Sequence, residues 1–250
     1  MARALMVMIV PFAAWLGMPC AGAEAGVLLG EVSRPGRTSR VVLELKARGL
    51  LKPGLAKGAD AEREKPLAMR VEARFAFVER VLDVGPGGRP RRVARRVAQA
   101  AAARNGEVLP EESAIRPVVS LLVAELRQGT AFTYSPGGPL PRPELELTQG
   151  AADPLTLAGL LPEAPVGVGD RWKVSAEAAR SLSGYDELAV NGLEASLAAI
   201  DDESARVRLR GEVRGAVLGG EGKITCDGSF TFDRKAGRID RLDLERSEVR

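Results

Sequence analysis

The stretch ITCDGSFTFDRKAGRIDRLDLE, residues 224–245, decides the fold class. In its first half, Ile224, Cys226, Phe230 and Phe232 share one face, and mostly polar residues separate them. A period of two is typical of a β-strand with one buried face. The segment DRKAG then places a glycine where a hairpin turn needs a positive φ, and residues 238–245 indicate the return strand. The stretch therefore predicts an antiparallel hairpin.

Further strands are predicted upstream of this hairpin, several of them followed by Gly- and Pro-containing turns. They fall at residues 41–47, 69–84, 118–126, 131–134 and 206–213. Capping residues predict two short helices, one with Asp153 as N-cap before Pro154, and one that begins after Ser175 and stops at Gly184. The predicted fold is mainly β (β-rich α+β), with antiparallel meanders that form curved sheets and two or three short helices.

A faint internal repeat bears on residues 89–103, whose pattern suits either a strand or a helix. Residues 71–75, VEARF, resemble residues 193–197, LEASL, and an acidic turn and an Arg/Val alternation follow each segment. Two repeated hairpins would make 89–98 a strand, which we favour, while the helix stays the alternative.

The chain divides into two parts after the first 23 residues. Residues 24–68 are expected to hold an N-terminal strand and a mobile linker, because residues 57–66 are charged and carry glycine and proline. Residues 69–250 form the predicted β-rich domain, with two related meander halves at 69–150 and 160–250. The chain stops in charged, strand-like sequence, which suggests that the natural protein continues past Arg250; a terminal strand is the alternative.

Residues 1–23 have the three parts of a cleavable signal peptide. Arg3 supplies the positive charge, residues 5–16 are apolar, and Ala21 and Ala23 form an A-x-A-like site with cleavage after Ala23. We therefore expect an exported protein, periplasmic or extracellular.

A lipid-anchored form is an alternative, because Cys20 follows an apolar run. Proline at position 19 fits a lipidation site poorly. No later stretch is long and apolar enough to cross a bilayer, so no membrane span is expected in the mature chain.

The composition argues against common kinds of active site. The chain has no histidine, which removes Ser-His-Asp and Cys-His nucleophile pairs and the commonest zinc ligand. Residues 215–223 fail the phosphate-loop register, and the acidic turn at 201–203 lacks the ligand spacing of a calcium loop. We expect no enzyme, no cofactor and no metal, and we interpret Cys226 and Trp172 as core residues.

A run of arginines is the densest basic segment. Arg91, Arg92, Arg95 and Arg96 are a candidate patch for a polyanion such as anionic lipid head groups, and the alternative is a solvated strand or helix face. Lys and Arg total 36 against 33 Asp and Glu, the charges are well mixed, and aromatic stacking residues are missing nearby. We therefore expect no nucleic-acid partner.

Residues 161–172, LPEAPVGVGDRW, carry a P-V-x-V-G-D-x-W motif, and FTFD with GRI follows at 230–239. Both are similar to segments of exported bacterial β-rich proteins that contain a domain of unknown function. The resemblance covers roughly residues 110–250. It implies export, a mostly β fold and a chain that runs on, and it carries over no active site.

These observations favour a non-enzymatic protein of the periplasm or cell envelope. One hypothesis is a curved sheet that binds a lipid or another apolar or amphipathic ligand in a groove lined by Leu, Val and Ala. The alternative is a structural or interaction module that binds an envelope protein through an exposed patch or sheet edge. An enzyme would need clustered groups with perturbed pKa values in a pocket.

Overall fold

The computed structural model describes residues 26–51, 66–108, 114–148, 152–217 and 219–250. The signal peptide expected at 1–23, with Ala21 and Ala23, lies outside the described residues. So does most of the linker expected before residue 68, since residues 52–65 are not described.

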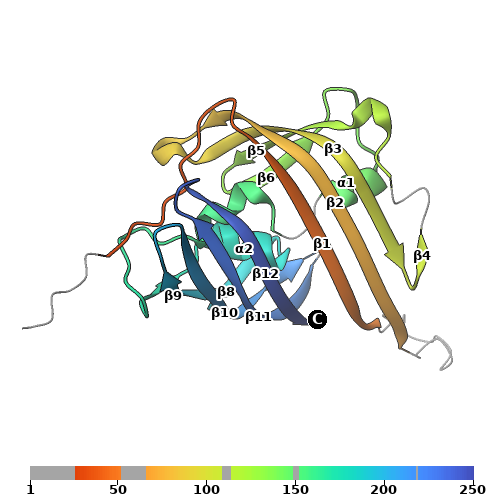
Figure 1. Ribbon diagram of the computed structural model, residues 1–250. Coiled ribbons are helices and arrows are strands. Elements are labelled where there is room, and N and C mark those ends of the chain that lie inside the picture. The colour runs from red at the N-terminus through yellow and green to blue at the C-terminus, as the bar shows by residue number, and fades with distance from the viewer. Residues whose placement is uncertain (1–25, 52–65, 109–113, 149–151, 218) are drawn as a thin grey trace, which may run out of the picture.

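Two antiparallel sheets make up the fold, each with six strands (Figure 1). Sheet 1 comprises β1 (Thr38–Leu51), β2 (Leu67–Val84), β3 (Pro90–Arg104), β4 (Glu107–Val108), β5 (Leu121–Arg127) and β6 (Thr130–Tyr134). Sheet 2 comprises β7 (Arg171–Lys173), β8 (Glu187–Asn191), β9 (Glu194–Ile200), β10 (Ser204–Val217), β11 (Gly220–Asp233) and β12 (Arg238–Val249). The helices are α1 (Arg142–Thr148), α2 (Ala176–Ser183) and the 3-10 segments η2 (Pro86–Gly88), η3 (Pro117–Val119) and η4 (Pro154–Leu160). The predicted mainly β fold is confirmed.

Each sheet has a main path of five antiparallel strands and a sixth strand that pairs off this path. Sheet 1 runs β1-β2-β3-β5-β6, with β4 on β3, and sheet 2 runs β7-β9-β10-β11-β12, with β8 on β10. The two segments of the faint repeat belong to corresponding hairpins, β2-β3 and β9-β10. The ambiguous segment is a strand rather than a helix, as the repeat favoured, with β3 at Pro90–Arg104. The sixth strand falls after β3 in sheet 1 but before β9 in sheet 2, so the two connectivities differ, and duplication stays a prediction.

Strand β1 corrects the expected organisation of the N-terminal part. It pairs with β2 from Thr38↔Arg80 to Leu51↔Leu67, so it is a full member of sheet 1 and not an element placed before the domain. The sequence pattern placed the strand at 41–47 only. The pairing is longer because the backbone ladder of both strands continues past the buried part of the sheet, where the alternation of buried side chains ends.

Both predicted helices begin directly after the capping residues identified in the sequence, Asp153 and Ser175. The Asp153 carboxylate accepts a hydrogen bond from the Leu155 amide at 2.9 Å, and the Ser175 hydroxyl accepts one from the Ala178 amide at 3.1 Å. Gly184 ends α2 with φ +72°, as expected. The helix after Asp153 is a 3-10 helix, and α1 was not predicted because residues 142–148 carry no apolar stripe of helical period.

Removal of the Ser175 cap gives a first test of these local rules. We expect Ser175→Ala to lower the free energy of unfolding by about 1 kcal/mol, because the Ala178 amide loses its partner at the start of a buried helix. Urea denaturation measures the change. Ser247→Ala, on exposed β12, should stay within about 0.5 kcal/mol; equal losses would contradict the capping role.

Sheet 2 carries the larger core, because α2 and the segment around η4 pack on its inner face. Cys226 is fully buried in it, and burial raises the pKa of its thiol, as suits a core residue. Trp172 is half-buried and its indole N–H donates to the Leu160 carbonyl at 2.8 Å. In the same motif, the Asp170 carboxylate accepts from the Gly167 amide at 2.8 Å. The P-V-x-V-G-D-x-W segment thus builds the turn that enters β7.

Candidate functional site

The inner face of sheet 1 is only partly covered. Its buried part is a cluster of Phe75, Phe77 and Leu122, against which Leu43 of β1 and Leu140 also pack. Below this cluster β1, β2 and β3 continue, and Figure 1 shows their long ends running beyond β5 and β6, with the short β4 beside the end of β3. The covered face therefore passes into an uncovered one along the same strands.

The uncovered part of this face is apolar. Leu45 shares the face of Leu43 by the period of two, and the register places Leu45 opposite Ala73 and Ala73 opposite Ala102. Leu45 is 41% exposed. We call this set the apolar shelf. It consists of Leu45, Ala47, Val71, Ala73 and Ala102, half-buried or exposed in every case.

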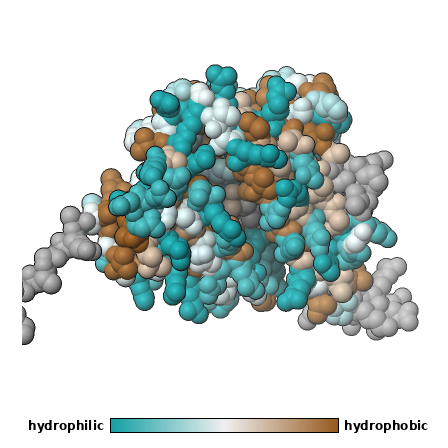
Figure 2. Space-filling view, viewed as in Figure 1, coloured by the Kyte–Doolittle hydropathy of each residue, from teal (hydrophilic) through white to brown (hydrophobic). Residues whose placement is uncertain are grey.

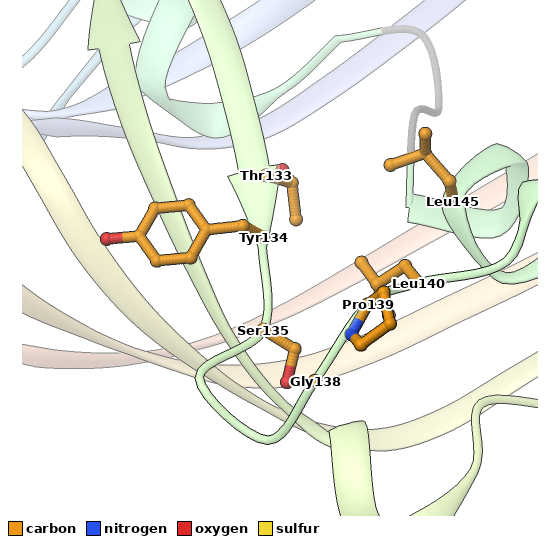
Figure 3. Close-up of a pocket in the computed structure, with 7 residues that line it drawn as sticks. All are labelled: Thr133, Tyr134, Ser135, Gly138, Pro139, Leu140 and Leu145. Carbon is orange, nitrogen blue, oxygen red and sulfur yellow. The ribbon is translucent and has the colours of Figure 1, made fainter.

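A small cavity lies beside the buried cluster. Its volume is about 300 Å³, at the lower end of the range for small-molecule sites. Figure 3 shows Thr133 directed toward Leu140 and Leu145, with the ring of Tyr134 pointing away. Leu140 belongs both to the cavity wall and to the cluster on the inner face. The cavity thus adjoins the same apolar surface, and its lining adds the hydroxyls of Thr133 and Ser135 to aliphatic groups.

A second cavity, of about 520 Å³, lies at the far ends of β2 and β3. Its polar groups already bind one another. Arg70 pairs with Glu72 at 2.6 Å, and the Asn105 side-chain carbonyl accepts from the Arg70 amide at 2.8 Å. Because these groups satisfy one another, the cavity presents no obvious set of ligand-binding groups.

A buried charge network joins sheet 1 to η4. Arg95 is 2% exposed, and its guanidinium donates to Glu79 at 2.9 Å and to both oxygens of Asp153 at 2.7 and 2.8 Å. The same group lies 4.9 Å from the centre of the Phe77 ring. Burial by itself would lower the pKa of Arg95, but the Asp153 and Glu79 carboxylates outweigh it and hold the pKa above its usual range.

Glu31 extends this network toward the N-terminal segment. Burial, and next the Glu79 charge, raise the pKa of Glu31 to about 7, against the opposing effect of Arg37, Arg89 and Arg238. Burial also raises the pKa of Glu79, although Arg95 donates to it. These are the clustered, perturbed carboxylates that an enzyme would need. Neither cavity described above is lined by them, so the arrangement serves the junction of the sheets.

Backbone hydrogen bonds place Glu31 at that junction. The Val32 amide donates to the Gly237 carbonyl at 3.0 Å, in the β11-β12 turn, and the Ser33 amide donates to the Gly88 carbonyl at 2.8 Å, in the β2-β3 turn. Arg37 donates to the Ala236 carbonyl at 2.7 Å. The segment around Glu31 therefore ties a hairpin of each sheet to the other.

The four arginines of the candidate polyanion patch do not form one surface. Arg95 is buried in the network, while Arg91 pairs with Asp83 at 2.9 Å. Arg92 donates to the Tyr134 hydroxyl at 3.2 Å, and Arg96 lies exposed on the outer face of sheet 1. In the sequence, the period of two already places Arg95 and Arg96 on opposite faces of the strand. This alternation predicts that the four arginines do not share one surface. The apolar shelf had no such signal, because it depends on the register of three strands.

The described residues contain neither a membrane-spanning helix nor a group of metal-binding side chains. None of the helices in the described ranges is long and apolar enough to cross a membrane. Within the same ranges, no three His, Cys, Asp or Glu side chains are grouped so that they could hold a metal ion. Comparison of the chain with protein-family models, with curated proteins and with solved structures gave no match.

Proposed function

We propose that this is an exported, non-enzymatic protein of the periplasm or cell envelope that binds an apolar or amphipathic ligand on the inner face of sheet 1. The observation that carries the proposal is the apolar shelf, where the strands continue past the buried cluster with Leu45 41% exposed. A buried aliphatic side chain contributes about 1.5–3 kcal/mol relative to an exposed one, so covering the shelf with an acyl chain is favourable.

The surroundings of the shelf support a ligand with one polar end. Figure 2 shows the surface hollowed between the two sheets, with hydrophilic residues around the hollow. The cavity beside Leu140 adds volume next to the buried cluster, and the hydroxyls of Thr133 and Ser135 supply a few polar groups there. An apolar wall with few polar groups is the usual form of a small-ligand site.

A fluorescent fatty-acid probe tests the proposal in solution, with a matched pair of variants on one strand. Leu45 and Val42 are 41% and 42% exposed on opposite faces of β1. We expect Leu45→Gln to raise the dissociation constant of the probe about tenfold, because an amide replaces the apolar contact. Val42→Gln should leave it within about twofold, since Val42 points to the outer face.

Native mass spectrometry of the protein from its own envelope fraction complements the titration. A co-purifying mass of lipid size that the Leu45→Gln variant loses would support the proposal. Equal weakening by both variants, or no saturable binding of the probe, would contradict it. A defined complex with another envelope protein and no lipid would favour the interaction module instead.

A further inference from the structure

Three arginines from three strands meet on the outer face of sheet 1. The register places Arg40 of β1 and Arg96 of β3 on either side of Val78 of β2. Arg80 follows two residues after Val78 on the same face. All three arginines are exposed. We call these three residues the arginine triad.

The triad is without counter-charges of its own. Among the residues that the structure describes, no carboxylate forms an ion pair with Arg40, Arg80 or Arg96, whereas Arg74, lower on the same face, is paired with Glu44. Arg80 lies diagonally from both Arg40 and Arg96, within reach of their long side chains, so the like charges repel each other. A bound anionic group would relieve this repulsion. The triad therefore favours binding of an external anion and does not stabilise the fold by itself.

Apolar and aromatic side chains surround the triad. Val78 at its centre is 42% exposed, and Leu121, which the register places beside Arg96, is 39% exposed. Tyr134 of β6 is exposed on the same face, and its hydroxyl accepts from Arg92. A soluble polyanion would use the charges alone. A bilayer interface also takes up aliphatic and aromatic side chains, at the depth where its head groups meet its acyl chains.

We propose that the arginine triad and Val78, with Leu121 and Tyr134 beside them, dock this face of sheet 1 on a membrane surface that carries anionic head groups. The guanidinium groups bind phosphate oxygens, for which their planar donors are suited, and Val78 and Leu121 enter the interface between them. The docking face is the opposite side of the sheet from the apolar shelf. The two proposals therefore stand or fall separately.

Vesicle co-sedimentation tests the docking face with the full mature chain. The probes are phosphatidylcholine vesicles with and without phosphatidylglycerol. We expect binding to the anionic vesicles only, weakened by added salt. Each arginine near an anionic surface raises partitioning about fivefold, so Arg40→Gln, Arg80→Gln and Arg96→Gln combined should lower it roughly a hundredfold. Because all three side chains are exposed and have no ion-pair partner within the described ranges, near-UV circular dichroism should be unchanged.

The matched control removes the same charge from sheet 2. Arg206, Arg208 and Arg210 are exposed along β10, where the register places Asp227 opposite Arg210. Their combined change to glutamine should lower partitioning far less than the triad variant does. An equal loss in both variants would overturn the proposal, because net charge alone would then explain the binding.

A second variant separates the membrane from a soluble polyanion. Val78→Ser keeps every charge and should weaken binding to anionic vesicles several-fold while leaving binding to soluble polyphosphate unchanged. Polyphosphate binding as tight as vesicle binding, with Val78→Ser without effect on either, would overturn the membrane assignment. Absence of binding to anionic vesicles at low salt would overturn it as well.

Discussion

Replacing Arg95 with methionine is expected to lower the free energy of unfolding by about 3–5 kcal/mol, the cost typical of breaking a buried ion pair from one side. Arg95 supplies the hydrogen bonds to Glu79 and Asp153 from a site that is 2% exposed. Methionine fills a similar volume but leaves both carboxylates without their cation. Thermal and urea denaturation, followed by circular dichroism, measure the loss.

Two further variants show whether the loss comes from the uncompensated charge. Arg91→Met removes an exposed arginine of the same strand, β3, that pairs with Asp83 of β2, and it should cost no more than about 1 kcal/mol. Adding Glu79→Gln to Arg95→Met should restore part of the stability, because one buried charge is then gone. A loss no larger than that of Arg91→Met would show that the network does not hold η4 on sheet 1.

The second large effect depends on pH and concerns Glu31. Its pKa is about 7 in the folded protein against an ordinary value of 4.5, so the folded state binds the extra proton between these values. Stability then falls as the pH rises through this window. Since one pKa unit corresponds to about 1.4 kcal/mol, the loss reaches about 3 kcal/mol by neutral pH.

A comparison with Glu31→Gln isolates this contribution from those of other titrating groups. Glutamine cannot ionise, so the variant should match the wild type near pH 4 and exceed its stability by about 3 kcal/mol near pH 8. The charged groups that act on this carboxyl are Glu79, Arg37, Arg89 and Arg238. Urea denaturation across the pH range gives both curves, and parallel curves would exclude a neutral, protonated Glu31 in the fold.

The elements that the sequence predicted correctly depend on local physics. The alternation at 69–84 predicted β2, and the caps at Asp153 and Ser175 predicted where η4 and α2 begin. Helix α1 escaped prediction because its one buried acidic residue, Glu144, is stabilised by Arg116 from a distant loop at 2.6 Å. A helix held by a partner outside its own segment leaves no pattern within that segment.

In the candidate sites too, local sequence predicts some features, while contacts between distant residues determine others. The arginine run 91–96 predicted a basic surface, yet Arg95 turned inward to Glu79 and Asp153, which lie 16 and 58 residues away in the chain. The arginine triad draws one residue from each of three strands. No window of sequence contains it, because only the pairing of β1, β2 and β3 brings Arg40, Arg80 and Arg96 together.

The sequence by itself determined the mainly β fold, most of the strands and the starts of two helices, because side-chain alternation and capping act over a few residues. Only the tertiary structure decided which faces of the strands are covered. The apolar shelf is open because β1, β2 and β3 extend beyond the segments that pack on Phe75 and Phe77. Likewise, burial among residues distant in the chain raises the pKa of Glu31, and two distant carboxylates hold the pKa of Arg95 above its usual range. Desolvation and charge pairing depend on every group packed around a side chain, not on its neighbours in the chain.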